Sequence, residues 1–289
     1  MLFFCPGNTS SYAGHECAPG HYCPAGTSSQ NQYPCPPGTH NLLTQRRSLQ
    51  DCLPCPPGLF CASSGLREAS GPCAAGHYCQ AGAVTPFPQD GLTGDICPRG
   101  HYCPQGSGVP QACPAGHYSN TTRNAALSLC LLCPAGFSCE ASGLSAPSQP
   151  CREGYYCPPG QLSSSPVSFT CSAGHMCPQG SASQTPCPPG TYQDHPGQAM
   201  CNLCPAGFYC AGALHPETGV LSGVLSPVPC PKGHYCPAGV AAGVEFPCPA
   251  GTFSGQAGLA RASECVPCPR GKYCSSAGLT APTGDCMPG

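Results

Sequence analysis

The chain has 289 residues, of which 30 are cysteine, 38 glycine and 39 proline. Ten lysines and arginines against twelve acidic residues leave a formal net charge of −2, and their scatter excludes the clustered basic patch that a nucleic-acid or polybasic membrane site would need. No apolar stretch approaches the roughly 18 residues of a membrane-spanning helix, so we expect no membrane-spanning segment.

The cysteine content predicts an oxidised chain. Slightly over one residue in ten is cysteine, the level typical of a disulfide scaffold, and the even count suits full pairing. Disulfides persist in oxidising compartments, so we expect an extracellular location, either secreted or at the cell surface. The segment Met1–Phe4 before Cys5 is too short for a signal peptide, so we expect the chain to be a piece of a longer protein.

In chain order, one short motif recurs from Cys17 onward. Its form is Cys-x-x-Gly-x-x-Cys, and a second form, Cys-Pro-x-Gly, lacks the second cysteine. The first form spans Cys17–Cys23, Cys55–Cys61, Cys73–Cys79, Cys97–Cys103, Cys133–Cys139, Cys151–Cys157, Cys171–Cys177, Cys204–Cys210, Cys230–Cys236 and Cys268–Cys274. The second form begins at Cys35, Cys113, Cys187 and Cys248.

These motifs group into larger cycles, each opened by the second form. Full cycles carry eight cysteines and the short one carries six, so each could close within itself. The expected domains are the tail of a truncated repeat at 1–34, cysteine-rich repeats at 35–112 and 113–186, a shortened repeat at 187–247 and a truncated repeat at 248–289.

The motif itself predicts tight turns. Glycine at its fourth position allows positive φ, proline stiffens the approach, and the aromatic residue before the second cysteine can pack over the disulfide. We therefore expect a small, disulfide-rich fold of tandem short β-hairpin modules that form an elongated rod, in which each module contacts its neighbours. Little or no helix is expected, and residues 122–132 are the best helical candidate.

Two patterns invite a metal or redox interpretation. Cys-x-x-Cys suits a redox dithiol or half a zinc site, but in so dense an array we favour structural disulfides; it occurs at Cys52/Cys55, Cys130/Cys133, Cys201/Cys204 and Cys265/Cys268. Histidine recurs in the motif, and we favour exposed turn residues over zinc ligands because Tyr155, Phe137, Phe208 and Lys272 take the same place in sister motifs. The recurring histidines are His21, His77, His101, His117, His175 and His234.

No set of residues suggests catalysis. The sequence has no Gly-x-Ser-x-Gly elbow, and its carboxylates are too sparse to nominate a general acid–base pair. We expect a protein that is not an enzyme and holds no cofactor and no metal. The carboxylates beside repeat cysteines are expected to be local turn acceptors; they are Asp51, Asp95, Glu153 and Asp285.

Two N-glycosylation sequons are present, Asn8-Thr9-Ser10 and Asn120-Thr121-Thr122. Asn120 is the better candidate, because it lies in the expected exposed loop after an opening motif. Asn202-Leu203-Cys204 is a poor candidate, because Cys204 is expected to be bonded.

The spacing from Cys113-Pro-Ala-Gly-His-Tyr-Ser119 to Cys130-Leu-Leu-Cys133, and its counterpart from Cys248 to Cys268, resembles the ephrin-receptor-like cysteine-rich repeat. That family is related to tumour necrosis factor receptor modules and to laminin-type EGF-like modules. The resemblance covers almost the whole chain and implies an extracellular spacer or protein-binding stalk, with the ligand-binding ectodomain of a cell-surface receptor as the alternative. The implied partner is an extracellular protein or neighbouring repeats of the parent chain.

Three disulfide patterns compete: consecutive pairing, local closure of each motif, and the interleaved pairing that the resemblance to tumour necrosis factor receptor modules implies. We favour interleaving, with local rings only at Cys97–Cys103 and Cys171–Cys177, because a stalk needs its units tied together. The interleaved pairs are Cys35–Cys52, Cys55–Cys73, Cys61–Cys79, Cys113–Cys130, Cys133–Cys151, Cys139–Cys157, Cys187–Cys201, Cys204–Cys230, Cys210–Cys236 and Cys248–Cys265.

Overall fold

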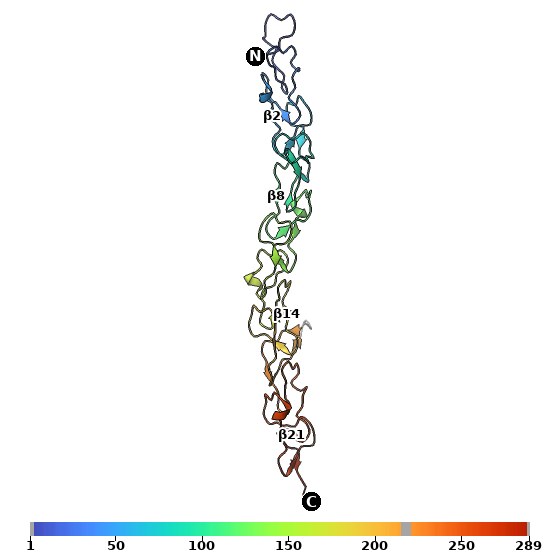
Figure 1. Cartoon of the computed structure of the whole chain (residues 1–289), viewed down its shortest axis with the longest axis vertical. Coiled ribbons are helices and arrows are strands. Elements are labelled where there is room, and N and C mark those ends of the chain that lie inside the picture. The colour runs from blue at the N-terminus through green and yellow to red at the C-terminus, as the bar shows by residue number, and fades with distance from the viewer. Residues whose placement is uncertain (1–2, 215–220, 288–289) are drawn as a thin grey trace. The chain divides into compact units, whose positions relative to one another are not determined.

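The computed structural model describes residues 3–214 and 221–287. Its regular structure is a series of two-stranded antiparallel hairpins, spread along the chain in Figure 1, and the described residues contain no α-helix. The chain divides into two compact units. Unit 1 comprises Met1–Cys133 and Cys139–Ser148, and unit 2 comprises Pro134–Ser138 and Gln149–Gly289.

Each hairpin joins strands of two or three residues. In unit 1 the pairs are β1 (Thr39–His40) with β2 (Leu53–Pro54), β3 (Leu59–Phe60) with β4 (Gly71–Pro72), β5 (His77–Cys79) with β6 (Gly94–Ile96), β7 (His101–Tyr102) with β8 (Gln111–Ala112), and β9 (His117–Tyr118) with β10 (Leu131–Leu132). In unit 2 they are β11 (Phe137–Ser138) with β12 (Gln149–Pro150), β13 (His175–Met176) with β14 (Thr185–Pro186), β15 (Thr191–Tyr192) with β16 (Asn202–Leu203), β17 (Phe208–Tyr209) with β20 (Val228–Pro229), β18 (Ala213–Leu214) with β19 (Leu221–Ser222), β21 (Thr252–Phe253) with β22 (Val266–Pro267), and β23 (Lys272–Tyr273) with β24 (Gly284–Asp285).

Most hairpins begin in the same way, just after a Cys-x-x-Gly turn. In the turn at Cys73, the amide of His77 donates to the carbonyl of Ala74 over 3.1 Å, and Gly76 has φ +82°. Because an L-residue rarely adopts this φ, the turn selects glycine. We call the residues from one such cysteine to the next a module.

The structure contains two kinds of module, distinguished by their disulfide. In a ring module the first cysteine bonds the cysteine six residues later, as in Cys73–Cys79. In a long-loop module it bonds a cysteine 14 or 17 residues later. The ring disulfides are Cys17–Cys23, Cys55–Cys61, Cys73–Cys79, Cys97–Cys103, Cys133–Cys139, Cys151–Cys157, Cys171–Cys177, Cys204–Cys210, Cys230–Cys236 and Cys268–Cys274. The long-loop disulfides are Cys35–Cys52, Cys113–Cys130, Cys187–Cys201 and Cys248–Cys265.

The interleaved pairing is therefore wrong wherever it crosses from one module to the next. The four long-loop pairs and the local rings at Cys97 and Cys171 agree with expectation. The tight turn brings both cysteines of a motif together, with Cα atoms 5.7 Å apart at Cys73–Cys79, a normal separation for a disulfide. The pairs that do not form are Cys55–Cys73, Cys61–Cys79, Cys133–Cys151, Cys139–Cys157, Cys204–Cys230 and Cys210–Cys236.

Backbone hydrogen bonds tie the modules together in place of crossed disulfides. Between the modules that begin at Cys55 and Cys73, four such bonds of 2.8–2.9 Å cross the junction. They run from the amide of Cys73 to the carbonyl of Gly58, from Gly58 to Cys79, from Cys61 to Ala83 and from Gly82 to Cys55. The first of these bonds recurs along the chain from Cys35 to Cys286. We expected local rings to leave the modules unconnected, and this was wrong because backbone hydrogen bonds join each module to the next.

Some contacts also join a module to the one two places later in the chain. A Cβ on Gly58 would lie 2.4 Å from the carbonyl oxygen of Gly106, and one on Gly20 would lie 2.2 Å from that of Gly65. Glycine is thus required here by close packing as well as by backbone angle. Within unit 1, colours follow one another in chain order in Figure 1, as expected when each module packs on its nearest followers.

The core is divided into small clusters, and each cluster lies at a junction between two modules. Phe60 packs against the next module's Cys73–Cys79 disulfide and Ala83, and Tyr192 packs likewise against Cys204 and Cys210. The aromatic residue of the motif therefore covers the disulfide of the following module. Because these clusters are small, disulfides and backbone bonds carry much of the stability.

Among the residues that the structure describes, helical structure is limited to four 3₁₀ turns of three residues each. The helical candidate at 122–132 contains one of them. Arg123 there has φ +63°, which interrupts a right-handed helix, and Cys130 is tied to Cys113. The turns are η1 (Leu49–Asp51), η2 (Leu127–Leu129), η3 (Val167–Phe169) and η4 (Ala262–Glu264).

Candidate functional site

The long-loop modules carry buried polar side chains that sequence analysis missed. In these modules the sixth residue after the first cysteine is polar where a ring module has its second cysteine. Each is at most 3% exposed: Asn41, Ser119, Gln193 and Ser254. The signal in the sequence was their position, because each stands six residues after the first cysteine, where the other modules have a buried second cysteine.

These side chains organise the long loop in the absence of a ring. The amide of Asn41 donates to the carbonyl of His21 over 3.2 Å and its oxygen accepts from Leu43. In the next long-loop module, the buried Asn124 amide donates to Ser119 and to the carbonyl of His101. A polar network thus fixes the loop on the preceding module, because buried amides need partners.

A carboxylate caps the 3₁₀ turn in two long loops. Asp51 accepts from the amides of Arg47 and Ser48 at 2.8 and 3.0 Å, and Glu264 accepts from the amide of Ala260. The Arg47 amide is the main cause that holds the pKa of Asp51 below its ordinary value. Asp51 is a local turn acceptor, as expected, whereas Asp285 pairs with Lys272 at 2.7 Å.

The motif histidines are packed rather than exposed. His21, His101 and His234 are half-buried, and each ring donates Nδ1–H to the carbonyl two residues earlier, at 3.0–3.1 Å. His77 is buried against Phe87, with ring centroids 5.4 Å apart. Within the described ranges, no three or more His, Cys, Asp or Glu side chains gather as a metal site would require.

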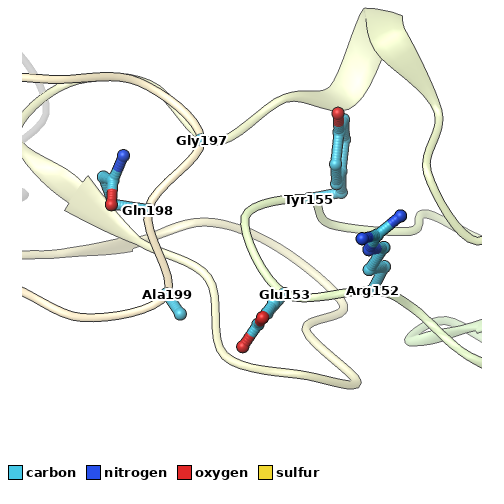
Figure 2. Close-up of a pocket in the computed structure, with 6 residues that line it drawn as sticks. All are labelled: Arg152, Glu153, Tyr155, Gly197, Gln198 and Ala199. Atoms are coloured by element: carbon cyan, nitrogen blue, oxygen red, sulfur yellow. The ribbon is translucent and has the colours of Figure 1, made fainter.

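Unit 2 has a shallow hollow with charged walls, shown in Figure 2. Arg152 and Tyr155 project to the same side and Glu153 points the other way, while Gln198 and Ala199 line the hollow from a segment of another module. Arg152 and Glu153 are exposed. The hollow could accept an acidic or amide-bearing side chain of a partner protein.

A second surface feature lies in unit 1. Leu127, Leu129, Leu131 and Leu132 are each 46–52% exposed. They belong to η2 and β10, which the Cys113–Cys130 disulfide and the β9–β10 pairing hold in place. Because successive residues of a strand point to opposite faces, Leu131 and Leu132 are exposed on different sides of the hairpin.

The predicted glycosylation residues are accessible. Asn8 and Asn120 are both exposed, as are Ser10 and Thr122, the hydroxyl residues of their sequons. Asn202 lies in β16, just before the disulfide-bonded Cys204, which leaves that sequon the poor candidate that was expected. Cys5 and Cys286 are exposed and free.

No protein-family model and no curated protein matches the chain. None of the described residues forms a helix long and apolar enough to cross a membrane. The architecture is that of a disulfide-bonded, cysteine-rich tandem repeat of the extracellular kind.

Proposed function

We propose that this chain is a non-enzymatic spacer or protein-binding stalk in a secreted or cell-surface protein. Its modules would be related to ephrin-receptor-like and tumour necrosis factor receptor-like repeats. Its task is to hold whatever flanks it at a set separation. Its partners are extracellular proteins or further repeats of the same parent chain.

The observation that carries this proposal is the repeated backbone junction. The bonds from Cys73 to Gly58 and from Cys204 to Gly190 occupy the same place in their modules and measure 2.8 and 2.9 Å. Backbone groups do not depend on side-chain identity, so outward-facing residues can vary while the step between modules stays constant. A constant step is what a spacer requires.

The alternative is a ligand-binding receptor ectodomain, which the hollow at Arg152 favours. Arginine and tyrosine are the residue types that most often carry binding energy at protein interfaces, and Arg152 has no carboxylate partner among the described residues. Binding of labelled chain to cells of its source would test this. If the chain is a receptor ectodomain, Arg152→Ala should bind these cells more weakly than the wild type does. If it is a spacer, the variant and the wild type should bind equally.

Excision of single modules tests the spacer directly. Residues 97–112 and 171–186 are ring modules of equal length, one in each unit. If the junction is generic, removal of either should leave a folded chain with its other disulfides intact. Small-angle scattering should then show the same decrease in maximum dimension for both. Loss of folding, or unequal decreases, would contradict the proposal.

A further inference from the structure

Every disulfide between described residues closes within a single module. Cys73–Cys79 lies inside the module that begins at Cys73, and Cys113–Cys130 lies inside the one that begins at Cys113. The other disulfides are placed in the same way. Among the described residues, the main chain is therefore the covalent link from one module to the next. When the two ends of the chain are pulled apart, tension follows the main chain and crosses each disulfide as the shorter covalent path.

A ring module has a long segment outside its disulfide. In the module that begins at Cys73, the chain runs 18 residues from Cys79 to Cys97 before it reaches the next disulfide. This segment folds back on itself, because the register pairs Cys79 of β5 with Gly94 of β6. Since paired strands lie about 5 Å apart and an extended residue spans about 3.3–3.6 Å, opening this module would lengthen the chain by about 50–60 Å.

A long-loop module has almost no such segment. In the module that begins at Cys113, the disulfide joins Cys113 and Cys130 with their Cα atoms 5.8 Å apart. Only the two residues of β10 separate Cys130 from Cys133, which carries the next disulfide. The 17-residue loop between Cys113 and Cys130 therefore bears no tension. Because β10 is already extended, this module would lengthen very little.

Backbone hydrogen bonds hold the ring module closed. To lengthen, the module at Cys73 must release the bonds from the amide of Cys97 to the carbonyl of Gly76 and from the amide of Cys79 to the carbonyl of Ser107, each 2.9 Å long. Each such bond contributes little net stability in water, whereas opening the disulfide requires a reductant. Tension therefore opens the hydrogen-bonded junction and leaves the ring closed.

We propose that the array is an extensible tether, in which tension opens ring modules while long-loop modules act as inextensible links. At rest the chain keeps the constant step of a spacer, and above a threshold tension it lengthens one ring module at a time. Each closed ring keeps its Cys-x-x-Gly turn, which lowers the loop-closure cost of refolding when the tension falls. The inference rests on the proposed spacer function, since only a chain fixed at both ends bears tension.

The first experiment is single-molecule force spectroscopy of the oxidised full chain, held by a handle protein fused to each end. Ring modules should open in separate steps. The three ring modules between the long-loop modules at Cys35 and Cys113 should release 12, 18 and 10 residues, and the same steps should return after the tension is relaxed. A single step that opens a whole unit would overturn the inference, as would a 17-residue step from a long-loop module in the oxidised chain.

Two disulfide variants give a matched test that does not depend on stability. Cys113→Ala/Cys130→Ala should increase the fully stretched length of the oxidised chain by about 50 Å, because its 17-residue loop then bears tension. Cys73→Ala/Cys79→Ala should increase that length by about 15 Å, because its ring holds six residues. Non-reducing peptide mapping checks that the other disulfides are unchanged. With those disulfides intact, equal increases in the two variants would overturn the inference, as would no increase in the first.

Failure of this inference differs visibly from failure of the proposed function. A chain that opens in one cooperative step can still hold a fixed separation at rest, and it would still show equal decreases when single modules are excised. Unequal decreases or loss of folding on excision would contradict the spacer itself, whatever steps the force measurement gives.

Discussion

At the scale of the residue, the glycine of each turn is held by its neighbours as well as by its own backbone. Gly58 and Gly251 share a φ of +85°, but a Cβ on Gly58 would lie 2.4 Å from the Gly106 oxygen, whereas one on Gly251 would meet nothing within 4 Å. Comparison of Gly58 with Gly251 therefore separates the strain of a positive φ from the close contact with a neighbouring module.

We predict that Gly58→Ala destabilises its junction more than Gly251→Ala. Both variants incur strain of about 1–2 kcal/mol from positive φ, and Gly58→Ala adds about 1–3 kcal/mol of overpacking. Hydrogen exchange of the amides that donate to these glycines, Cys73 and Cys268, should speed up more in Gly58→Ala. Equal acceleration would mean that the contact with Gly106 is unimportant.

The lowered pKa of Asp51 leads us to predict that the stability of the η1 region depends on pH. Its pKa is lowered in the folded chain, chiefly by the Arg47 amide, so its contribution is present above the unfolded pKa near 3.9 and is lost as pH falls through the folded value. Asp51→Ala should cost about 0.5–2 kcal/mol at neutral pH and should flatten the loss of stability below about pH 4. Hydrogen exchange of Cys52 and its neighbours measures this.

The control for Asp51 is Glu68→Ala. Glu68 pairs with the neighbouring Arg67 at 3.8 Å, and both side chains are largely exposed. Such a pair contributes little, so this variant should keep the acid dependence of the wild type. An identical response in both variants would show that η1 capping is not the cause.

At the scale of the element, ring and long-loop disulfides should differ in their contribution. In the chain-entropy model, closing a six-residue ring contributes about 2 kcal/mol and closing a 17-residue loop about 3 kcal/mol. Cys113→Ala/Cys130→Ala should therefore destabilise its module more than Cys73→Ala/Cys79→Ala does. Local hydrogen exchange under native conditions compares them, and a larger loss for the ring pair would contradict the model.

At the scale of the whole molecule, the expected rod makes a measurable prediction. A compact chain of this length would have a radius of gyration of about 19 Å. Because the backbone bonds between modules in the described ranges join near neighbours in sequence, we predict a value well above that from small-angle scattering. Reduction of the disulfides under native buffer should increase it further, and a value near 19 Å would mean that the array folds back on itself.

The sequence by itself determined the repeat and its local structure. The spacing of Cys73, Gly76 and Cys79 requires a tight turn with positive φ, so hairpins without helix could be predicted from residue chemistry alone. The accessibility of Asn120 also followed from its place in a loop. Each of these depends on residues close together in the sequence.

Only the tertiary structure decided how the modules are joined. The bond from Gly58 to Cys79 involves backbone groups that every residue has, so nothing in the sequence marks it. Crossed disulfides were expected because only cysteines were visible as links. The packed histidines and the buried Asn41 and Ser119 were missed for the same reason: their burial depends on a neighbouring module whose position local spacing does not define.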